Sequence, residues 1–221
     1  MADETILILA NGDWSGIERL GALAAEADWI VAADGGCTKG LEVGLQIDEV
    51  IGDLDSIPAP DRARLAEANT PVVHAFPRDK DATDLELAIE HALHRRPRRI
   101  VLFGALGERI DHTIANLHLL EKGAETGIPI ELIVGRETLF AVRGELKLER
   151  AKVGDRVSLI PLSEAARVST TGLRYPLCDE LLYRAGSRGV SNVVSADRPA
   201  LHVSEGLLWV VHASGSEDEN G

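Results

Sequence analysis

The sequence lacks several features that define common classes of protein. Only two cysteines occur, Cys37 and Cys178, and they lie far apart with no Cys-x-x-Cys pair and no neighbouring histidine cluster. We therefore expect neither a disulfide nor a cysteine-based zinc site. No segment approaches the roughly 20 consecutive apolar residues of a membrane helix, and the opening Met-Ala-Asp-Glu lacks the basic start of a signal peptide. These absences predict a cytoplasmic protein with no membrane partner.

Basic residues are also scarce. Lysine and arginine number 23 against 36 aspartates and glutamates, which gives a net charge of −13. Because proteins that neutralise nucleic-acid phosphates present clustered lysines and arginines, no nucleic-acid partner is expected. The one basic run, at residues 95–99, is typical of a solvated helix end, and a polyanion site is the alternative. The phosphate-binding fingerprints G-x-x-x-x-G-K-[ST] and, after the first apolar run, G-x-G-x-x-G are absent as well.

The apolar content is high enough for a globular core, at 45% of 221 residues. In residues 1–135, apolar runs typical of strands alternate with helical patterns, which predicts an α/β domain with a doubly wound, mostly parallel sheet. The expected strands are residues 6–10, 29–33, 49–51, 72–76 and 99–103. The expected helices are residues 16–27, 62–68, 82–94 and 113–123.

The second half of the chain is rich in short β-type runs, and its helical period vanishes from about residue 145. Turn-forming residues separate these runs, so residues 136–213 are expected to form a small all-β, antiparallel sandwich domain. The expected strands are residues 146–148, 156–162, 167–170, 181–183, 190–194 and 207–212. Residues 214–221 are small, polar and acidic, which predicts a disordered tail.

Aspartates follow the expected strands of the first half. The ends of parallel strands meet at one edge of a sheet, which is where such folds bind ligands, so these aspartates should lie close together. Gathered carboxylates repel one another unless a cation lies among them, and Mg²⁺ carrying a phosphate is the expected one. The aspartates are Asp34, Asp53, Asp55, Asp81, Asp84 and Asp111.

Each acidic motif also has a purely structural alternative. Asp53 and Asp55 project to the same side if the strand continues, as metal ligands should, but a polar turn capped by Asp53 is the alternative. Asp81 and Asp84 have the spacing of a helix capping box, a role that is compatible with metal binding. Asp111 could be the N-cap of the helix expected from residue 113.

Phosphate binding would rest on the carboxylate-held metal, loop amides and two basic residues. Arg109 lies beside a glycine-bearing turn and a helix N-terminus, where a guanidinium suits a phosphate. Lys80 is the second basic residue. Asn116 is expected to pack at the edge of the core.

Four motifs together resemble those of the thiamine pyrophosphokinase (thiamine diphosphokinase) family in order and approximate spacing. The β-rich half, with Gly-Val-Ser-Asn at residues 189–192, resembles the thiamine-binding domain of that family, so the resemblance covers all but the acidic tail. The four motifs are Ala33-Asp34-Gly35-Gly36, Gly52-Asp53-Leu54-Asp55-Ser56, Lys80-Asp81-Ala82-Thr83-Asp84 and Gly107-Glu108-Arg109-Ile110-Asp111-His112.

The resemblance implies that ATP gives its β,γ-pyrophosphoryl group to the hydroxyl of thiamine, forming thiamine diphosphate and AMP. It implies that Mg²⁺ is held by Asp53, Asp55 and Asp84, with Asp34 nearby and Asp81 in support. Arg109 would brace the polyphosphate, and Asp111 would either orient phosphate-side contacts or accept the hydroxyl proton. Lys80, Arg109, Asp111 and Asn116 form the implied ATP site.

Ser191 and Asn192 are the thiamine contacts that the resemblance implies, and an ordinary polar pair between strand and turn is the alternative. Members of the family are homodimers with a site shared between subunits, so a homodimer is expected in which these two residues serve the ATP of the partner. Two other functions stay open: a pterin pyrophosphokinase with a similar metal motif, and a non-catalytic sensor of nucleotides or thiamine phosphates.

Overall fold

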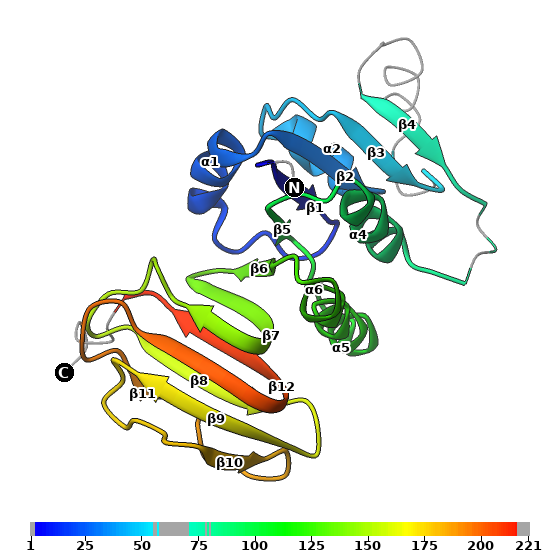
Figure 1. Cartoon of the computed structure of the whole chain (residues 1–221). Coiled ribbons are helices and arrows are strands. Elements are labelled where there is room, and N and C mark those ends of the chain that lie inside the picture. The colour runs from blue at the N-terminus through cyan, green and yellow to red at the C-terminus, as the bar shows by residue number, and fades with distance from the viewer. Residues whose placement is uncertain (1–2, 55–56, 58–70, 78, 80, 216–221) are drawn as a thin grey trace. The chain divides into compact units, whose positions relative to one another are not determined.

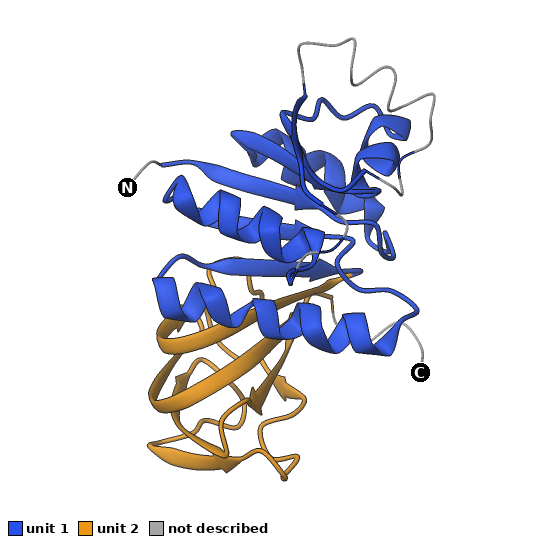
Figure 2. Cartoon of the chain, turned by 90° about the vertical axis from the view of Figure 1, so that its right-hand side faces the viewer, with its two compact units in different colours: residues 1–135 blue, residues 136–221 orange. Residues whose placement is uncertain are grey.

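The computed structural model describes residues 3–54, 57, 71–77, 79 and 81–215. The chain divides into two compact units, residues 1–135 and residues 136–221, which are described separately below (Figures 1 and 2). Among the described residues, no helix is long and apolar enough to cross a membrane.

In the described part of unit 1, six strands lie side by side, and they pair with one another in parallel. The strand order is β6-β5-β1-β2-β3-β4, so the chain builds outward from β1 in one direction and then returns to the other side of β1. The sheet has a switch point between β1 and β5, which is where open α/β sheets bind ligands. The strands are β1 (Thr5–Leu9), β2 (Trp29–Ala33), β3 (Glu49–Gly52), β4 (Val72–Ala75), β5 (Arg99–Phe103) and β6 (Ile130–Val134).

Helices cover this sheet, and its central strands are buried on both faces, as continuous apolar runs predict. On β1, Leu7 and Leu9 pack in a core with Leu20 and Leu23, while Ile8 is buried as well. Helix α4 packs against β2 and β3 (Figure 1). The helices are α1 (Ile17–Glu26), α2 (Gly36–Glu42), α4 (Asp84–His94), α5 (Ile110–Leu119) and α6 (Glu121–Thr126).

The expected α/β class is confirmed, but two helical segments differ from the prediction. Helix α2 was not predicted, because its sequence Gly-Cys-Thr-Lys-Gly-Leu-Glu contains two glycines, which disfavour helix. A Cβ on Gly36 would lie 2.3 Å from the backbone oxygen of Leu9, so the glycine lets α2 pack closely on β1. The helix predicted over residues 113–123 is two helices, α5 and α6, separated at Leu120. The helix predicted over residues 62–68 lies outside the described residues.

Unit 2 consists of antiparallel strands, in agreement with the predicted β-rich domain. Strand β12 organises it, since its first part pairs with β9, its last part pairs with β8, and both parts pair with β7. The pairing register with β7 shifts between Val203 and Leu208, which divides the strand into these two parts. Because of this interruption, the sequence predicted a strand only over residues 207–212. The strands are β7 (Glu137–Lys147), β8 (Arg156–Pro161), β9 (Ala165–Thr171), β10 (Glu180–Tyr183), β11 (Asn192–Val193) and β12 (Ala200–Ala213).

A buried histidine and a buried aspartate contact each other within unit 2. The Nε2 of His212, on β12, is 2.8 Å from Oδ2 of Asp155. Burial on its own would raise the pKa of Asp155, but hydrogen bonds from the backbone N–H of Lys152, from His212 and from the backbone N–H of Gly215 outweigh it. The pKa therefore lies below the ordinary value of 3.8.

Candidate active site

Three aspartates converge at the carboxyl end of the unit 1 sheet. One carboxylate oxygen from each of Asp34, Asp53 and Asp84 lies within 4.8 Å of the other two. Asp34 follows β2, Asp53 follows β3, and Asp84 begins α4. The family resemblance implied Asp53 and Asp84 as metal ligands with Asp34 nearby, whereas the third implied ligand, Asp55, lies outside the described residues.

The close approach of these side chains depends on Gly52, the last residue of β3. A Cβ at this position would lie 3.0 Å from the Cβ of Asp34 and 3.0 Å from Oδ1 of Asp84. Asp34 itself has a left-handed backbone with φ of 44° and is buried, and its N–H donates to the backbone oxygen of Ile51 at 2.9 Å. Residues other than glycine rarely adopt the left-handed conformation, and those that do are concentrated at functional sites. Aspartate adopts this conformation more readily than most residues.

The start of α4 is capped by Thr83, which corrects the prediction of a capping box led by Asp81. The Oγ1 of Thr83 accepts a hydrogen bond from the backbone N–H of Glu86 at 3.2 Å. Asp84 is therefore the first residue inside the helix, where a carboxylate interacts favourably with the helix dipole. Asp81 lies exposed before the helix, outside the group of three carboxylates.

A cavity of about 1000 Å³ lies beside the carboxylates, within unit 1. It opens where the segments after β1 and β5 lie side by side, which is the switch point of the sheet. The backbone N–H of Gly12 donates to the oxygen of Gly104 at 2.7 Å and joins the two segments. Residues predicted for the site that line this cavity are Asp34, Asp84, Arg109 and Asn116.

Arg109 and Asp111 form a forked ion pair at the cavity rim. The Nη2 of Arg109 is 2.5 Å from Oδ2 of Asp111, and its Nε is 3.2 Å from Oδ1. Hydrogen bonding from Arg109, and then from the backbone N–H of His112, lowers the pKa of Asp111, and the same pair raises the pKa of Arg109. Helix α5 begins at Ile110, so Asp111 lies inside its first turn, and the alternative that it is the N-cap is wrong.

Asn116 and Lys39 shape the cavity by holding backbone. The Nδ2 of Asn116 donates to the backbone oxygen of Ala105 at 2.6 Å, which ties α5 to the segment after β5. The Nζ of Lys39 donates to the backbone oxygens of Gly12 at 2.6 Å and of Asn11 at 3.2 Å. Lys39 was not predicted because α2 was not predicted, although a lysine shortly after the Asp-Gly-Gly motif was the available signal.

Ser191 and Asn192 lie in unit 2. Asn192 is buried, where its Oδ1 accepts from the N–H of Tyr175 at 3.0 Å and from the N–H of Val193 at 2.9 Å, and its Nδ2 donates to the oxygen of Tyr175 at 2.7 Å. Ser191 is exposed and has a left-handed backbone with φ of 59°. Asn192 therefore holds the chain near Tyr175, and Ser191 presents its side chain to solvent. Lys80 lies outside the described residues.

Comparison with known proteins gives the family. The model described as thiamin pyrophosphokinase, catalytic domain, matches residues 20–132, and that described as thiamin pyrophosphokinase, vitamin B1 binding domain, matches residues 144–208. The chain belongs to the thiamine pyrophosphokinase family. The resemblance carried by the four sequence motifs is thereby confirmed.

Individual members of the thiamine pyrophosphokinase family match almost the whole chain. The chain is 32% identical over 213 residues to thiamine pyrophosphokinase of Bacillus subtilis (strain 168), covering 96% of this chain and 99% of that protein. The crystal structure of the B. subtilis protein aligns with a TM-score of 0.84 and 29% identity, over 97% of this chain and 100% of that chain. The thiamin pyrophosphokinase of Geobacillus thermodenitrificans aligns with a TM-score of 0.81 and 31% identity, over 96% of this chain and 99% of that chain.

Proposed function

We propose that this chain is a thiamine pyrophosphokinase, an enzyme that transfers the β,γ-pyrophosphoryl group of ATP to the hydroxyl of thiamine and releases AMP. The observation that carries the proposal is the group of three carboxylates beside a cavity that also holds Arg109 and Lys39. This arrangement lies in a chain that matches both the catalytic and the vitamin B1 binding domains of one family.

The three carboxylates fit Mg²⁺ as the metal of this site. They offer hard oxygen ligands from three different elements, within 4.8 Å of one another, and Mg²⁺ is bound in proteins by a few carboxylates together with substrate phosphate and water. Asp34, Asp53 and Asp84 would hold the ion, with Asp55 as the further ligand expected from the sequence. When bound, Mg²⁺ neutralises negative charge on the polyphosphate.

The remaining polar side chains of the cavity bind and orient the polyphosphate. The Nε and Nη2 of Arg109 donate to Asp111, which fixes the plane of the guanidinium and leaves the N–H groups of Nη1 and the second N–H of Nη2 as a fork for a phosphate. Lys39 supplies a second positive charge from α2. Positioning and charge stabilisation account for most of the catalysis in phosphoryl transfer.

Of the two roles expected for Asp111, we assign it the orientation of phosphate-side contacts and not the acceptance of the hydroxyl proton. A lowered pKa makes its carboxylate a weaker base, and its oxygens already accept hydrogen bonds from Arg109. The thiamine hydroxyl needs no strong base in a transfer that rests mainly on positioning.

The thiamine contacts are assigned to residues 191 and 192, with Ser191 as the principal one. Asn192 is buried, and its amide holds the backbone of Tyr175 and Val193, whereas Ser191 is exposed. Replacing Ser191 by alanine should therefore raise the KM for thiamine without changing the KM for ATP. An equal change in both constants would contradict this assignment.

The homodimer and the cytoplasmic location are proposed on the resemblance to the family and on the sequence. Light scattering coupled to size exclusion gives the mass of the particle in solution, where twice the chain mass supports the dimer and the chain mass alone contradicts it. Cell fractionation tests the location.

The reaction is tested by AMP release from ATP and Mg²⁺ with thiamine, with a hydroxymethyl pterin or with no acceptor, followed by the mass of the product. Thiamine-dependent AMP and a product that gains two phosphates support the proposal. AMP with the pterin alone would identify a pterin pyrophosphokinase. Nucleotide binding without AMP in any mixture would identify a sensor.

A further inference from the structure

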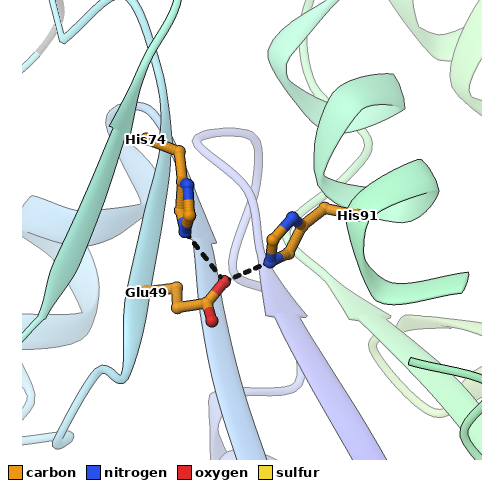
Figure 3. A group of neighbouring side chains, drawn as sticks. All are labelled: Glu49, His74 and His91. Atoms are coloured by element: carbon orange, nitrogen blue, oxygen red, sulfur yellow. Dashed lines mark ion pairs between the residues drawn. The ribbon is translucent and has the colours of Figure 1, made fainter. Parts of the chain in front are cut away.

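A second group of side chains with metal-ligating donor atoms lies in unit 1, apart from the residues that line the cavity. Glu49 on β3, His74 on β4 and His91 on α4 each direct one donor atom to a common point, and these atoms lie within 4.8 Å of one another (Figure 3). The three residues are 25 and 17 positions apart, so only the fold brings them together.

The packing of α4 on β3 explains why this group forms. The carboxyl end of β3, at Gly52, faces Asp84 at the start of α4. Glu49 lies three residues back along the strand, about 10 Å away at 3.3 Å per residue. His91 lies seven residues farther along the helix, about 10.5 Å at 1.5 Å per residue. Strand and helix therefore meet twice, with aspartates at one end and with Glu49 and His91 at the other.

The register of β3 and β4 adds the third side chain. Ile51 pairs with His74 in this parallel ladder. Because alternate residues of a strand project to the same face, Glu49 and His74 share a face with Ile51. The Nε2 of His74 is 3.4 Å from Oε2 of Glu49, and the Nε2 of His91 contacts the same oxygen. The two imidazole rings lie 4.7 Å apart between centroids.

Burial makes the donor atoms of this group unusual. The side chain of Glu49 is 9% exposed, and the Nε2 atoms of His74 and His91 both approach its buried Oε2. A buried carboxylate is costly unless a cation or donor compensates it. The histidine side chains are about one third exposed, at 36% and 34%, which gives an ion a route to the carboxylate.

The chemistry of the donors selects the class of ion. Two imidazole nitrogens and one carboxylate oxygen suit Zn²⁺ and similar first-row ions, whereas Mg²⁺ prefers oxygen ligands alone. Two ligands that each bind a tetrahedral ion at about 2.0 to 2.1 Å lie about 3.4 Å from each other, which is the separation of His74 and Glu49. The ring of His91 needs only to withdraw from the carboxylate to become the third ligand.

We propose that Glu49, His74 and His91 bind one Zn²⁺-class ion, with a fourth position left for water. The ion would fasten β4 to β3 and α4. Strand β4 is the last strand of its sheet and pairs with β3 alone among the described strands, so a cross-link there restrains the edge. This site is independent of the proposed transfer reaction, because its residues do not line the cavity.

The first test is Zn²⁺ and Co²⁺ binding to the full chain after treatment with a chelator, in excess Mg²⁺. We expect one tightly bound Zn²⁺ per chain, a tetrahedral Co²⁺ absorption spectrum, and a rise of Tm with Zn²⁺. The double variant His74→Ala/His91→Ala should lose at least about tenfold in Zn²⁺ affinity, since even changes next to a ligand cost 10- to 100-fold. Retained affinity in the double variant would overturn the proposal.

Two controls separate this site from other sources of binding. His94→Ala alters a histidine on the same helix whose Nδ1 faces the backbone oxygen of Glu90, and it should bind Zn²⁺ like the wild type. Asp53→Asn alters the carboxylates at the other end of β3, and it too should retain Zn²⁺ binding. Loss of binding in Asp53→Asn with retention in the double histidine variant would place the ion among the aspartates and refute the proposal.

A measurement on the wild type removes any dependence on how the variants fold. Diethyl pyrocarbonate modifies accessible histidines, and peptide mass spectrometry locates the modified residues. Zn²⁺ should protect His74 and His91 but not His94. Equal modification with and without Zn²⁺ would mean that the three side chains form only an ion pair, and would contradict the proposed site.

Discussion

Gly52 provides the sharpest test of how the carboxylates assemble. In Gly52→Ala, the new Cβ would lie 3.0 Å from both Oδ1 of Asp84 and the Cβ of Asp34, a separation tighter than nine in ten real Cβ contacts. One or both aspartates must therefore shift by a few tenths of an ångström. Because a misplacement of 1 Å can cost about 100-fold in rate, we expect a loss of about tenfold in turnover and a higher Mg²⁺ requirement. Crowding and backbone strain should also cost about 1 to 3 kcal/mol of stability.

The assay is AMP release as a function of Mg²⁺ concentration, with Tm measured in parallel. Gly127→Ala is the matched control, because Gly52 and Gly127 both have a positive φ, of 153° and 72°, but a Cβ on Gly127 would meet nothing within 4 Å. It should lower Tm and leave the Mg²⁺ dependence unchanged. If Gly52→Ala keeps both the turnover and the Mg²⁺ dependence of the wild type, then the close approach at Gly52 does not set the geometry of the site.

Three further predictions concern single side chains. Asp53→Asn removes a charge from the metal group, so turnover should fall at least about 100-fold while circular dichroism stays that of the wild type; wild-type turnover would contradict its role. Arg109→Lys keeps the charge but loses the fork, so kcat/KM for ATP should fall about tenfold, and an unchanged value would show that the fork is not used. The lowered pKa of Asp155 contributes stability that is complete above the unfolded pKa and is lost as pH falls through the folded pKa, below 3.8. Urea unfolding at a series of acidic pH values should therefore show a steeper loss for the wild type than for Asp155→Asn, and parallel curves would contradict this.

The positions of the aspartates could be predicted because a parallel sheet places successive strand ends at one edge. Asp34, Asp53 and Asp84 converge for that reason. The capping roles of single residues could not be predicted, because the sequence allows a helix to begin at any of several neighbouring residues. Thr83 takes the cap that was assigned to Asp81, and Asp111 turns to Arg109 within the first turn of α5.

Other features depended on packing that a local pattern does not contain. Helix α2, and with it Lys39, was missed because Gly36 is selected by its close approach to β1 and not by helix propensity. The group of Glu49, His74 and His91 requires both the β3–β4 register and the packing of α4. No local sequence pattern links three donors separated by 25 and 17 residues.

The function proposed for the three carboxylates is pyrophosphoryl transfer to thiamine. The most direct measurement compares thiamine-dependent AMP release by the wild type and by Asp84→Asn, at saturating ATP and Mg²⁺, with the mass of the thiamine product recorded in each case. We expect AMP and thiamine diphosphate in equal amounts from the wild type, and at least about 100-fold less of both from the folded variant. Equal rates from the two proteins, or AMP without thiamine diphosphate, would contradict it.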